Sequence, residues 1–327
     1  MTSLPHLAVE LDGHGANPAL GGTTDIAVLT RAAAAAEATG FVFATLADSP
    51  LPPPGGRLEA GVRAAFLASR TQRIGLAPTL HVTTTEPFHL ATQLASLDHA
   101  ARGRGAWVVG ADNSAAALAT VGRAPLGPEE LRREVADVIE VARRLWDSWA
   151  DDAVIKDRAT GRFLDPDRVH HVNFTGASFT VAGPLITPRP PQGQLVVAGP
   201  AGLGVTAQLD IALVTDPADA EQARRDGAPL VFAELEVQLD TEVPATDRLP
   251  WPAGGRLRHT GSLEGLVALL QRLAPVVDGV RLHPAELAVD LPVLARLARP
   301  RTAAGTLRAA LGLPRPHNRF GLRESAA

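Results

Sequence analysis

Short β-rich runs alternate with helical patterns from one end of this 327-residue chain to the other. Strictly alternating β and α elements predict parallel strands, and eight such strands predict a closed barrel in preference to an open doubly wound sheet. We therefore expect a single (β/α)8 TIM barrel over residues 1–304, with a C-terminal helix and tail over 305–327. The expected strands are 4–11, 41–46, 73–80, 105–110, 195–198, 210–215, 229–237 and 279–283.

Two of the intervening helices have clear ends. Thr24 and Asp25 open an alanine-rich helix that closes at Gly40, which places an N-cap and a C-terminal glycine where helices prefer them. The strongest helical pattern covers residues 128–146, with acids in its first turn, arginines in its last turn and one apolar stripe. The first strand is not followed by a clear G-x-G-x-x-G, so a dinucleotide-binding sheet is not supported.

Three segments interrupt the alternation. Residues 150–194 form a long, polar, proline-rich connection with a plausible hairpin at FTGASFTV. Because a connection of this length in a compact barrel is usually a lid or a binding loop, we expect it to serve the site. Residues 240–258 make a second, smaller excursion, and the tail from residue 305 reads as a short helix followed by a frayed end.

Composition excludes several classes of function. The net charge is −4, the pI is about 6.2 and no basic run stands out, which argues against nucleic acid and anionic membranes as partners. The chain has no cysteine, which excludes disulfides and thiolate chemistry. The N-terminus lacks a secretory pattern and no apolar run reaches the length of about 18 residues that a membrane helix needs. We expect a soluble, cytoplasmic protein with a small-molecule ligand.

Polar residues gather where the expected strands end, and the carboxyl ends of the strands form the active site in barrels of this kind. The third strand ends at Thr79 and His81, and the second ends at Asp48. The first strand leads to His14, and the eighth ends at His283. Further polar residues expected at this rim are Asp12, Asn17, Ser49, Thr83, Thr84 and Thr85.

Each of these residues also has a purely structural interpretation. Asp48 before Ser49 and Pro50 is typical of a turn or a helix cap, and the threonines favour a strand followed by a cap. The rim histidines have neither H-x-H nor H-E-x-x-H spacing, so no metal site is expected. A serine hydrolase is not supported, because the chain has no G-x-S-x-G elbow. Glu234 and Glu236 share one face of their strand, and the pattern leaves open which face that is.

Several stretches resemble luciferase-like monooxygenases, especially the branch that contains nitrilotriacetate, dibenzothiophene-sulfone and pristinamycin-pathway monooxygenases. The run TQRIGLAPTLHVTTTEPFHLATQLASLDHAARGRGAW is similar to the family's third-to-fourth-strand region, and ATLADSP to the end of its second strand. The run VIEVARRLWDSWADDAVIKDRATGRFLDPDRVHHVNFTGASFTVAGPLITPRPPQG resembles its helix and insertion, and GTLRAALGLPRP its C-terminal segment. The resemblance covers most of residues 40–200 and the tail, and it is weak from 205 to 290.

This resemblance implies an enzyme that binds reduced FMN from a separate reductase, activates O2 as a flavin peroxide and oxygenates a small organic substrate. The flavin carries the chemistry, while the protein binds, orients and shields it. Asp48 and Thr79 match family positions near the flavin ring. The resemblance also implies a homodimer.

Three departures from the family pattern fall on the cofactor. Val108 stands where the family usually has an asparagine that contacts the ring, and the His and Tyr that help to hold the phosphate are absent. The phosphate loop, with Gly199 and Gly202, has Pro200 and Ala201 where serines are usual. Because proline removes an N–H from a loop that should cradle phosphate, we expect FMN to bind weakly.

Two hypotheses remain open at this point. In the first, the chain is an FMN-dependent monooxygenase with an altered flavin site, in which His14, His81 and His170 contact substrate or peroxide. In the second, the barrel has lost tight flavin binding and acts as a non-catalytic subunit or a binding protein.

Overall fold

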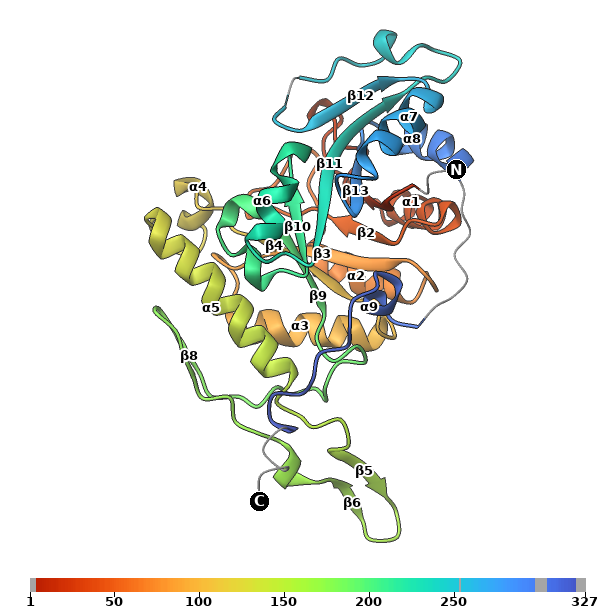
Figure 1. Ribbon diagram of the computed structural model, residues 1–327. Coiled ribbons are helices and arrows are strands. Elements are labelled where there is room, and N and C mark those ends of the chain that lie inside the picture. Colours follow the sequence, from red (N-terminus) through yellow and green to blue (C-terminus); the bar gives the residue numbers. More distant parts are fainter. Residues whose placement is uncertain (1–3, 253, 298–304, 322–327) are drawn as a thin grey trace.

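The computed structural model describes residues 4–252, 254–297 and 305–321, and in this part of the chain eight parallel strands close into a barrel surrounded by helices (Figure 1). Each barrel strand pairs in parallel with both of its neighbours, and the pairing of β10 with β11 closes the ring. The barrel strands, in order around the ring, are β1 (His6–Glu10), β2 (Phe43–Leu46), β3 (Gly75–His81), β4 (Ala106–Gly110), β9 (Val196–Pro200), β10 (Ile211–Val214), β11 (Leu230–Leu239) and β13 (Gly279–Pro284). All eight correspond to the strands expected from the sequence, so the predicted (β/α)8 barrel is confirmed.

Small and apolar side chains fill the lower interior of the barrel. Ala8, Ala77 and Ala198 are buried in one cluster with the rings of Phe43 and Phe232, whose centroids lie 5.6 Å apart. Gly279 makes room for them, because a Cβ atom there would lie 2.3 Å from the Phe232 ring. The interior is therefore a packed core and not a pore.

The helices cover the outside of the sheet, where the alternate residues of each strand are apolar. The helix from Ile26 is capped by Asp25, and Gly40 ends it in a left-handed conformation, as the sequence predicts. The expected helix over residues 128–146 has those bounds. The helices of the described residues are α1 (Ile26–Thr39), α2 (Ala60–Ala68), α3 (Pro87–Ala100), α4 (Ala115–Ala119), α5 (Pro128–Trp146), α6 (Ala220–Arg225), α7 (Leu263–Leu273), α8 (Leu287–Leu294) and α9 (Leu307–Ala310). None of the helices in these residues is long and apolar enough to cross a membrane.

The excursion after β11 contains a strand that the sequence pattern did not reveal. Strand β12 (Leu257–Gly261) pairs in parallel with the upper half of β11, Leu235–Leu239, beyond the point where β10 ends. Its sequence, LRHTG, lacks the apolar alternation of a half-buried strand. The strand forms because the free edge of β11 offers backbone partners.

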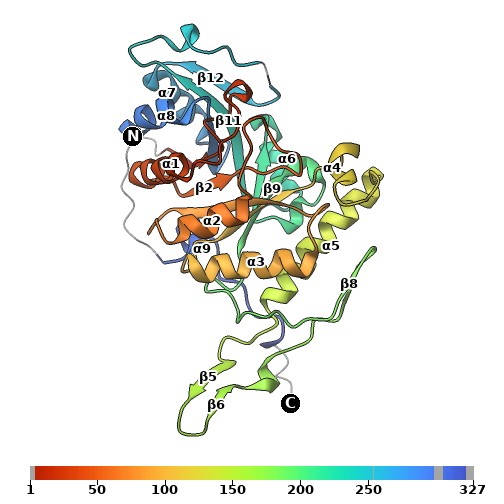
Figure 2. The ribbon, with the colours of Figure 1, turned by 180° about the vertical axis from the view of Figure 1, so that it is seen from behind.

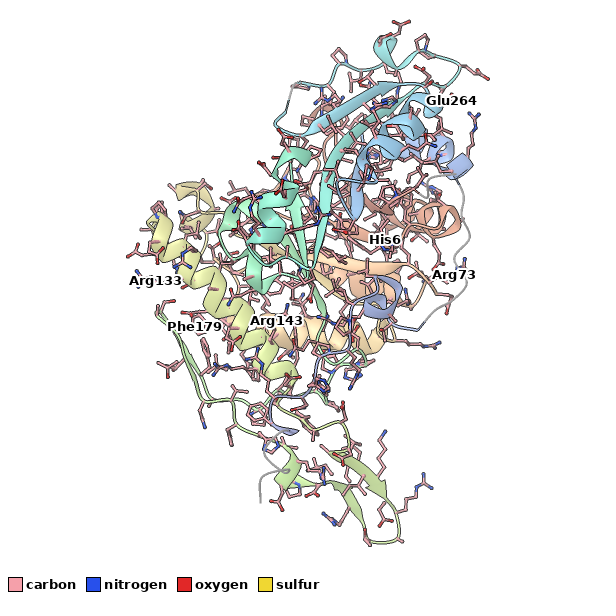
Figure 3. All side chains as sticks on the ribbon, in the orientation of Figure 1. His6, Arg73, Arg133, Arg143, Phe179 and Glu264 are labelled. Atoms are coloured by element: carbon pink, nitrogen blue, oxygen red, sulfur yellow. The ribbon has the colours of Figure 1, made fainter. Side chains whose placement is uncertain are left out.

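The long insertion lies at the amino-terminal end of the barrel strands, since it connects the end of α5 with the start of β9. It holds two hairpins, β5 (Val154–Asp157) with β6 (Arg162–Leu164), and β7 (Phe174–Thr175) with β8 (Thr180–Val181), and the second is the hairpin expected from the sequence. The β5–β6 hairpin projects from the molecule in both ribbon views (Figures 1 and 2). The β7–β8 hairpin lies against α5, with Phe179 beside that helix (Figure 3). Contrary to expectation, the insertion does not cover the carboxyl ends of the strands.

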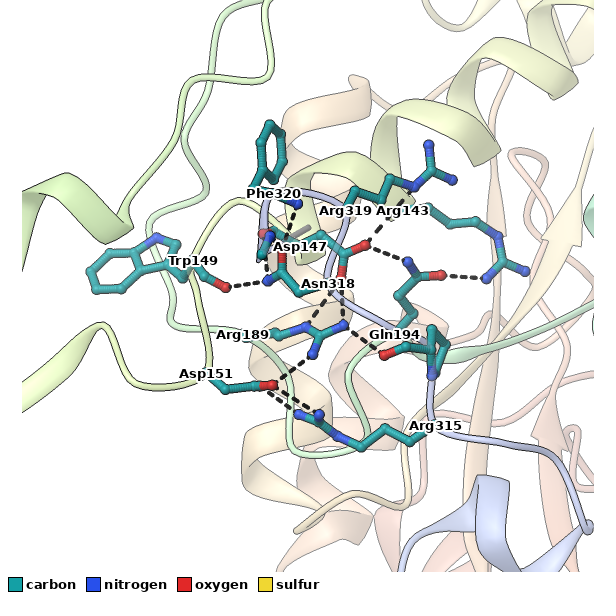
Figure 4. A network of polar contacts seen from close by, with 12 residues as sticks. Arg143, Asp147, Trp149, Asp151, Arg189, Gln194, Arg315, Asn318, Arg319 and Phe320 are labelled. Carbon is teal, nitrogen blue, oxygen red and sulfur yellow. Dashed lines mark hydrogen bonds and ion pairs between the residues drawn. The ribbon is translucent and has the colours of Figure 1, made fainter. Parts of the chain in front are cut away.

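The C-terminal tail is tied to the start of the insertion by polar contacts (Figure 4). Asp147 is fully buried and accepts hydrogen bonds from Arg189 and Gln194. Arg315 forms a two-bond ion pair with Asp151, and Asn318 Nδ2 donates to the backbone carbonyls of Asp147 and Trp149. The described tail, residues 305–321, is therefore held in place, and the rest of the frayed end expected from the sequence lies outside the described residues.

The packing of Phe232 against Gly279 predicts that the substitution Gly279→Ala destabilises the protein. The added methyl group would meet the ring of Phe232, which is itself fully buried, so the ring and its neighbours must shift. We expect a loss of about 1–3 kcal/mol in the free energy of unfolding, measured by denaturant titration. Gly255→Ala is the control, because its Cβ meets nothing within 4 Å, and equal stability of the two variants would contradict this packing.

Candidate functional site

A cavity of about 340 Å³ opens at the carboxyl ends of β2 and β3. Larger hollows lie elsewhere, one of about 500 Å³ near the start of β1 and one of about 620 Å³ between α5 and the C-terminal tail. Neither of them gathers the polar strand-end residues, and barrels of this type place their sites at the carboxyl face. The cavity is lined by Asp48, Ser49, Pro50, Pro52, Pro53, Arg57, Glu59, Thr79, Leu80, His81, Thr84 and Thr85. The structure thus brings together Asp48, Thr79 and His81, as expected.

His81 links two loops of the rim. Its side chain points into the upper barrel against Gly110, where a Cβ atom would lie 2.8 Å from His81 Nδ1. The backbone N–H of Asp112 donates to Nδ1 at 3.2 Å, which leaves Nε2 to donate to the carbonyl of Asp48 at 3.1 Å. This pattern fixes the neutral Nε2–H tautomer. Because both nitrogens are engaged by backbone groups, His81 holds the loops after β2 and β4 in register.

Asp48 is engaged in the same way. One carboxylate oxygen accepts from the N–H of Ser49 at 2.8 Å, and the other accepts from the N–H of Ala60, the first residue of α2, at 2.6 Å. Asp48 therefore acts as a capping residue, as its structural interpretation predicts. The carboxylate contributes its charge to the cavity wall, and both of its oxygens accept hydrogen bonds from backbone N–H groups.

A second polar group fills the mouth of the barrel on the side of β1, β11 and β13. Arg281 Nη2 lies 3.1 Å from Glu10 and 2.9 Å from Glu234, while His283 places Nδ1 3.0 Å from Glu10 and Nε2 3.3 Å from Glu234. Burial alone would raise the pKa of Glu234, but the charge of Arg281 and the contact with His283 lower it to about 2. Burial likewise opposes ionisation of Glu10, and His283 and Arg281 hold its pKa well below the usual range. These carboxylates stay ionised in the protein interior because their partners are fixed.

The segment around β12 covers this buried group. Arg258 makes a two-bond ion pair with Glu236 at 2.8 and 2.5 Å, and its guanidinium lies 4.6 Å from the centre of the Trp251 ring. Asn17, on the loop after β1, donates to the carbonyls of Leu249 and Pro250. The excursion after β11 therefore forms the cover over the mouth that the sequence suggested for the longer insertion.

The other residues expected to bind cofactor or substrate do not line the cavity. Val108 is buried inside the barrel and pairs with Thr79, while the added Cβ of Gly199 would face Leu209 and Val109 on the outer side of the sheet. Gly202 is exposed on the loop after β9. His14 is exposed on the loop after β1, and does not line the cavity.

His170 lies in the insertion at the opposite end of the barrel. Its ring stacks on Phe320 of the C-terminal tail, with centroids 5.1 Å apart, and its backbone N–H donates to Ser148. The structure does not bring His170 together with His14 or His81. In the described residues no group of three acidic or histidine side chains is arranged to hold a metal ion.

The sequence alone did not reveal the ion pair of Arg57 with Asp12 or the buried charges of Glu10 and Arg281. A signal was present, because Glu234-Leu235-Glu236 and Arg281-Leu282-His283 alternate polar with apolar residues in otherwise apolar strands. Since helices cover the outer face of a parallel barrel, the polar members of such an alternation belong inside it. Glu234 and Glu236, whose face the sequence left open, both point into the barrel.

The fold and the cavity define a TIM-barrel protein with a small-molecule site at the carboxyl ends of its strands. A profile described as "Luciferase-like monooxygenase" matches residues 8–233. The chain is 36% identical to a subunit of pristinamycin IIA synthase from Streptomyces pristinaespiralis over 328 aligned residues, covering 97% of this chain and 98% of that protein. The chain belongs to the luciferase-like monooxygenase family.

A further relative supports the branch, and a solved structure supports the fold. The chain is 40% identical to nitrilotriacetate monooxygenase component A of Aminobacter aminovorans over 136 residues, which are 41% of this chain and 30% of that protein. The solved structure of EDTA monooxygenase from Chelativorans sp. BNC1 matches with a TM-score of 0.77 at 22% identity, covering 96% of this chain and 99% of that one. The chain thus spans the pristinamycin synthase relative almost completely, but about a third of the nitrilotriacetate relative.

The described residues do not form a complete site for FMN, the flavin that the family implies. The cavity beside Thr79 could take part of a flat ring, but the loop expected to hold the phosphate has lost one backbone donor. Pro200 has no N–H, and the adjacent first turn of α5 carries Glu129 and Glu130, which repel an anion. Arg132, which lies against Gly204 of the loop, is itself held by Glu129 at 2.7 and 2.9 Å.

The buried charges at the mouth predict a change in acid stability. With a pKa of about 2 in the folded state against 4.5 ordinarily, Glu234 adds stability above pH 4.5 that is lost as the pH falls toward 2. In Glu234→Gln, Arg281 loses a partner, so we expect a loss of about 3 kcal/mol at neutral pH and a shallower decline of stability in acid. Urea unfolding across this pH range measures both. Glu242→Gln, at an exposed position, should leave the curve unchanged, and parallel pH curves for wild type and Glu234→Gln would contradict the assignment.

Proposed function

We propose that this chain is a component of a flavin-dependent monooxygenase that oxygenates a small organic substrate with O2. Membership of the luciferase-like family supports the reaction class, and the observation that carries the proposal is the convergence of Asp48, Thr79 and His81 on one cavity at the barrel mouth. Reduced FMN comes from a separate reductase in this proposal, as in two-component systems. A homodimer in the cytoplasm is part of the same proposal, since the family resemblance and the composition favour it.

The roles of this chain's residues in that function are to position and to shield. His81 and Asp48 hold the loops that form the cavity, because their polar atoms bond to the backbone of these loops. The β12 segment covers the other half of the mouth and excludes water from the buried charges.

A second candidate is a subunit that supports oxygenation without binding flavin tightly. Two observations favour it: the incomplete phosphate end, and the match along almost the whole chain to a relative that is named as one subunit of a synthase. In this version a second, different chain supplies the missing flavin contacts. The two candidates share the reaction and differ in which chain holds the FMN.

Titration of the purified protein with FMN and with photoreduced FMN under anaerobic conditions distinguishes them. We expect weak binding, in the high micromolar range, with the reduced flavin bound more tightly than the oxidised one. Absorbance and fluorescence of the flavin report the binding. No change for either form at high micromolar protein would favour the second candidate, and tight stoichiometric binding would show that the phosphate end is complete after all.

The loop after β9 provides a sharper prediction. Replacing Pro200 and Ala201 by serine in one double variant restores an N–H and two hydroxyl donors. Hydrogen bonds to charged groups stabilise by about 1.5–3 kcal/mol, so we expect FMN affinity to rise about tenfold or more. Pro166→Ser, on the insertion at the opposite end of the barrel, is the control. An unchanged affinity in the double variant would mean that this loop does not hold the phosphate.

A further inference from the structure

The charged side chains on the wall of the cavity are all matched by other groups of the chain. Asp48 accepts from two backbone N–H groups, as described above. Glu59 caps α2, with its two oxygens 2.9 and 2.6 Å from the N–H groups of Gly61 and Val62. Arg57 is the positively charged residue of the wall. Its Nε and Nη2 atoms donate to the two carboxylate oxygens of Asp12 at 2.9 and 2.5 Å. No charged group of the described wall is left for a ligand.

Asp12 holds a second arginine as well. Arg63 Nη1 lies 3.4 Å from Asp12, and Arg63 Nη2 donates to the carbonyl of Ala47, so this guanidinium is turned away from the cavity and is almost fully buried. Asp12 comes from the loop after β1, while both arginines come from the segment between β2 and α2 and from α2 itself. Around the cavity, three carboxylates, of Asp12, Asp48 and Glu59, face two guanidinium groups, which leaves one negative charge in excess. A free anion that enters the cavity would find no positively charged group without an ion-pair partner in the described wall.

The remaining wall is uncharged. Thr79, Thr84 and Thr85 line the cavity, and their hydroxyl groups have no hydrogen-bond partner within the described residues. The prolines of the loop after β2 supply apolar surface on the opposite side. Such a wall offers hydrogen bonds to a neutral acceptor oxygen and contact to an apolar body, which is how small-molecule sites combine orientation with burial.

We propose that this cavity selects uncharged organic molecules that carry an acceptor oxygen, and that Asp12 sets the selectivity by withholding Arg57 from the ligand. This inference rests on the proposed function only in treating the part of the cavity that a flavin ring beside Thr79 leaves open as the site of the organic substrate. It separates this chain from relatives named for polycarboxylates, such as nitrilotriacetate and EDTA monooxygenases. Asp12 acts here as a positioning residue, since it touches the arginine and does not line the cavity.

The test uses two probes with the same skeleton, methyl phenyl sulfone and para-methylsulfonylbenzoate, which differ by one carboxylate. Calorimetric titration of the full chain without flavin measures their affinities, so the result does not depend on oxygenation. We expect the wild-type protein to prefer the neutral sulfone by about tenfold or more, since an unpaired anion loses its water without gaining a charged partner.

The variant Asp12→Asn keeps the shape of the side chain and removes its charge, which frees Arg57 to face the cavity. We expect the affinity for the benzoate to rise about tenfold, while that for the neutral sulfone stays within a factor of two to three. The double variant Asp12→Asn, Arg57→Gln should lose this gain, which assigns it to Arg57. Thermal unfolding of each variant shows whether it is folded. If Asp12→Asn does not fold, the double variant, which lacks both charges, measures the preference in its place.

Three outcomes would overturn the proposal. The wild-type protein binds the benzoate as well as the sulfone; the preference stays the same when Asp12 is neutral; or neither probe binds any folded variant, so that the cavity is not a ligand site. If the protein fails to oxygenate any substrate but shows the expected change of preference, the proposed function fails and this inference stands.

Discussion

The pairing of β11 with three strands is the constraint on which the rest of the structure depends. Its lower half, Leu230–Ala233, bonds to β10 and closes the barrel, while its upper half bonds to β12 on the same side. On its other side β13 runs along six of its residues. Because all eight strands of the closed barrel run parallel, the polar carboxyl ends of β1, β2, β3 and β13 meet at one mouth. Because β10 pairs with the lower half of β11 and β12 with its upper half, the arginines of the β12 segment lie over that mouth.

Much of this fold is visible in the sequence because its signals are local. Strand β9 reads as a continuous apolar run, and α5 has its proline, its acids and its arginines in the positions that helix ends favour. Strand β12 carries no such signal, because LRHTG becomes a strand only through the edge of β11. The expected position of the long insertion is wrong for a different reason. Length alone suggested a lid, although a segment between a helix and the next strand must return to the amino end of that strand.

The candidate site was predicted in part, for reasons that chain order explains. Asp48, Thr79 and His81 follow directly from strand ends, and the structure gathers them. What the sequence could not show is which polar atoms are already engaged. Asp12 and Arg57 are separated by 45 residues, and Glu10 and His283 by 273, so their pairing depends on closure of the barrel. Charge that looks available in a sequence can be neutralised by a partner that only the fold supplies.

The ties between the C-terminal tail and the insertion affect the order in which this protein can fold during synthesis. Asn318 bonds to Asp147 and Trp149 across about 170 positions, and Leu307 on α9 packs into the base of the barrel against residues of several strands. A nascent chain on the ribosome therefore reaches β13 with the base of its barrel still open. The base is complete only when residues 305–321 have left the exit tunnel, so a segment made after all eight barrel strands completes the core.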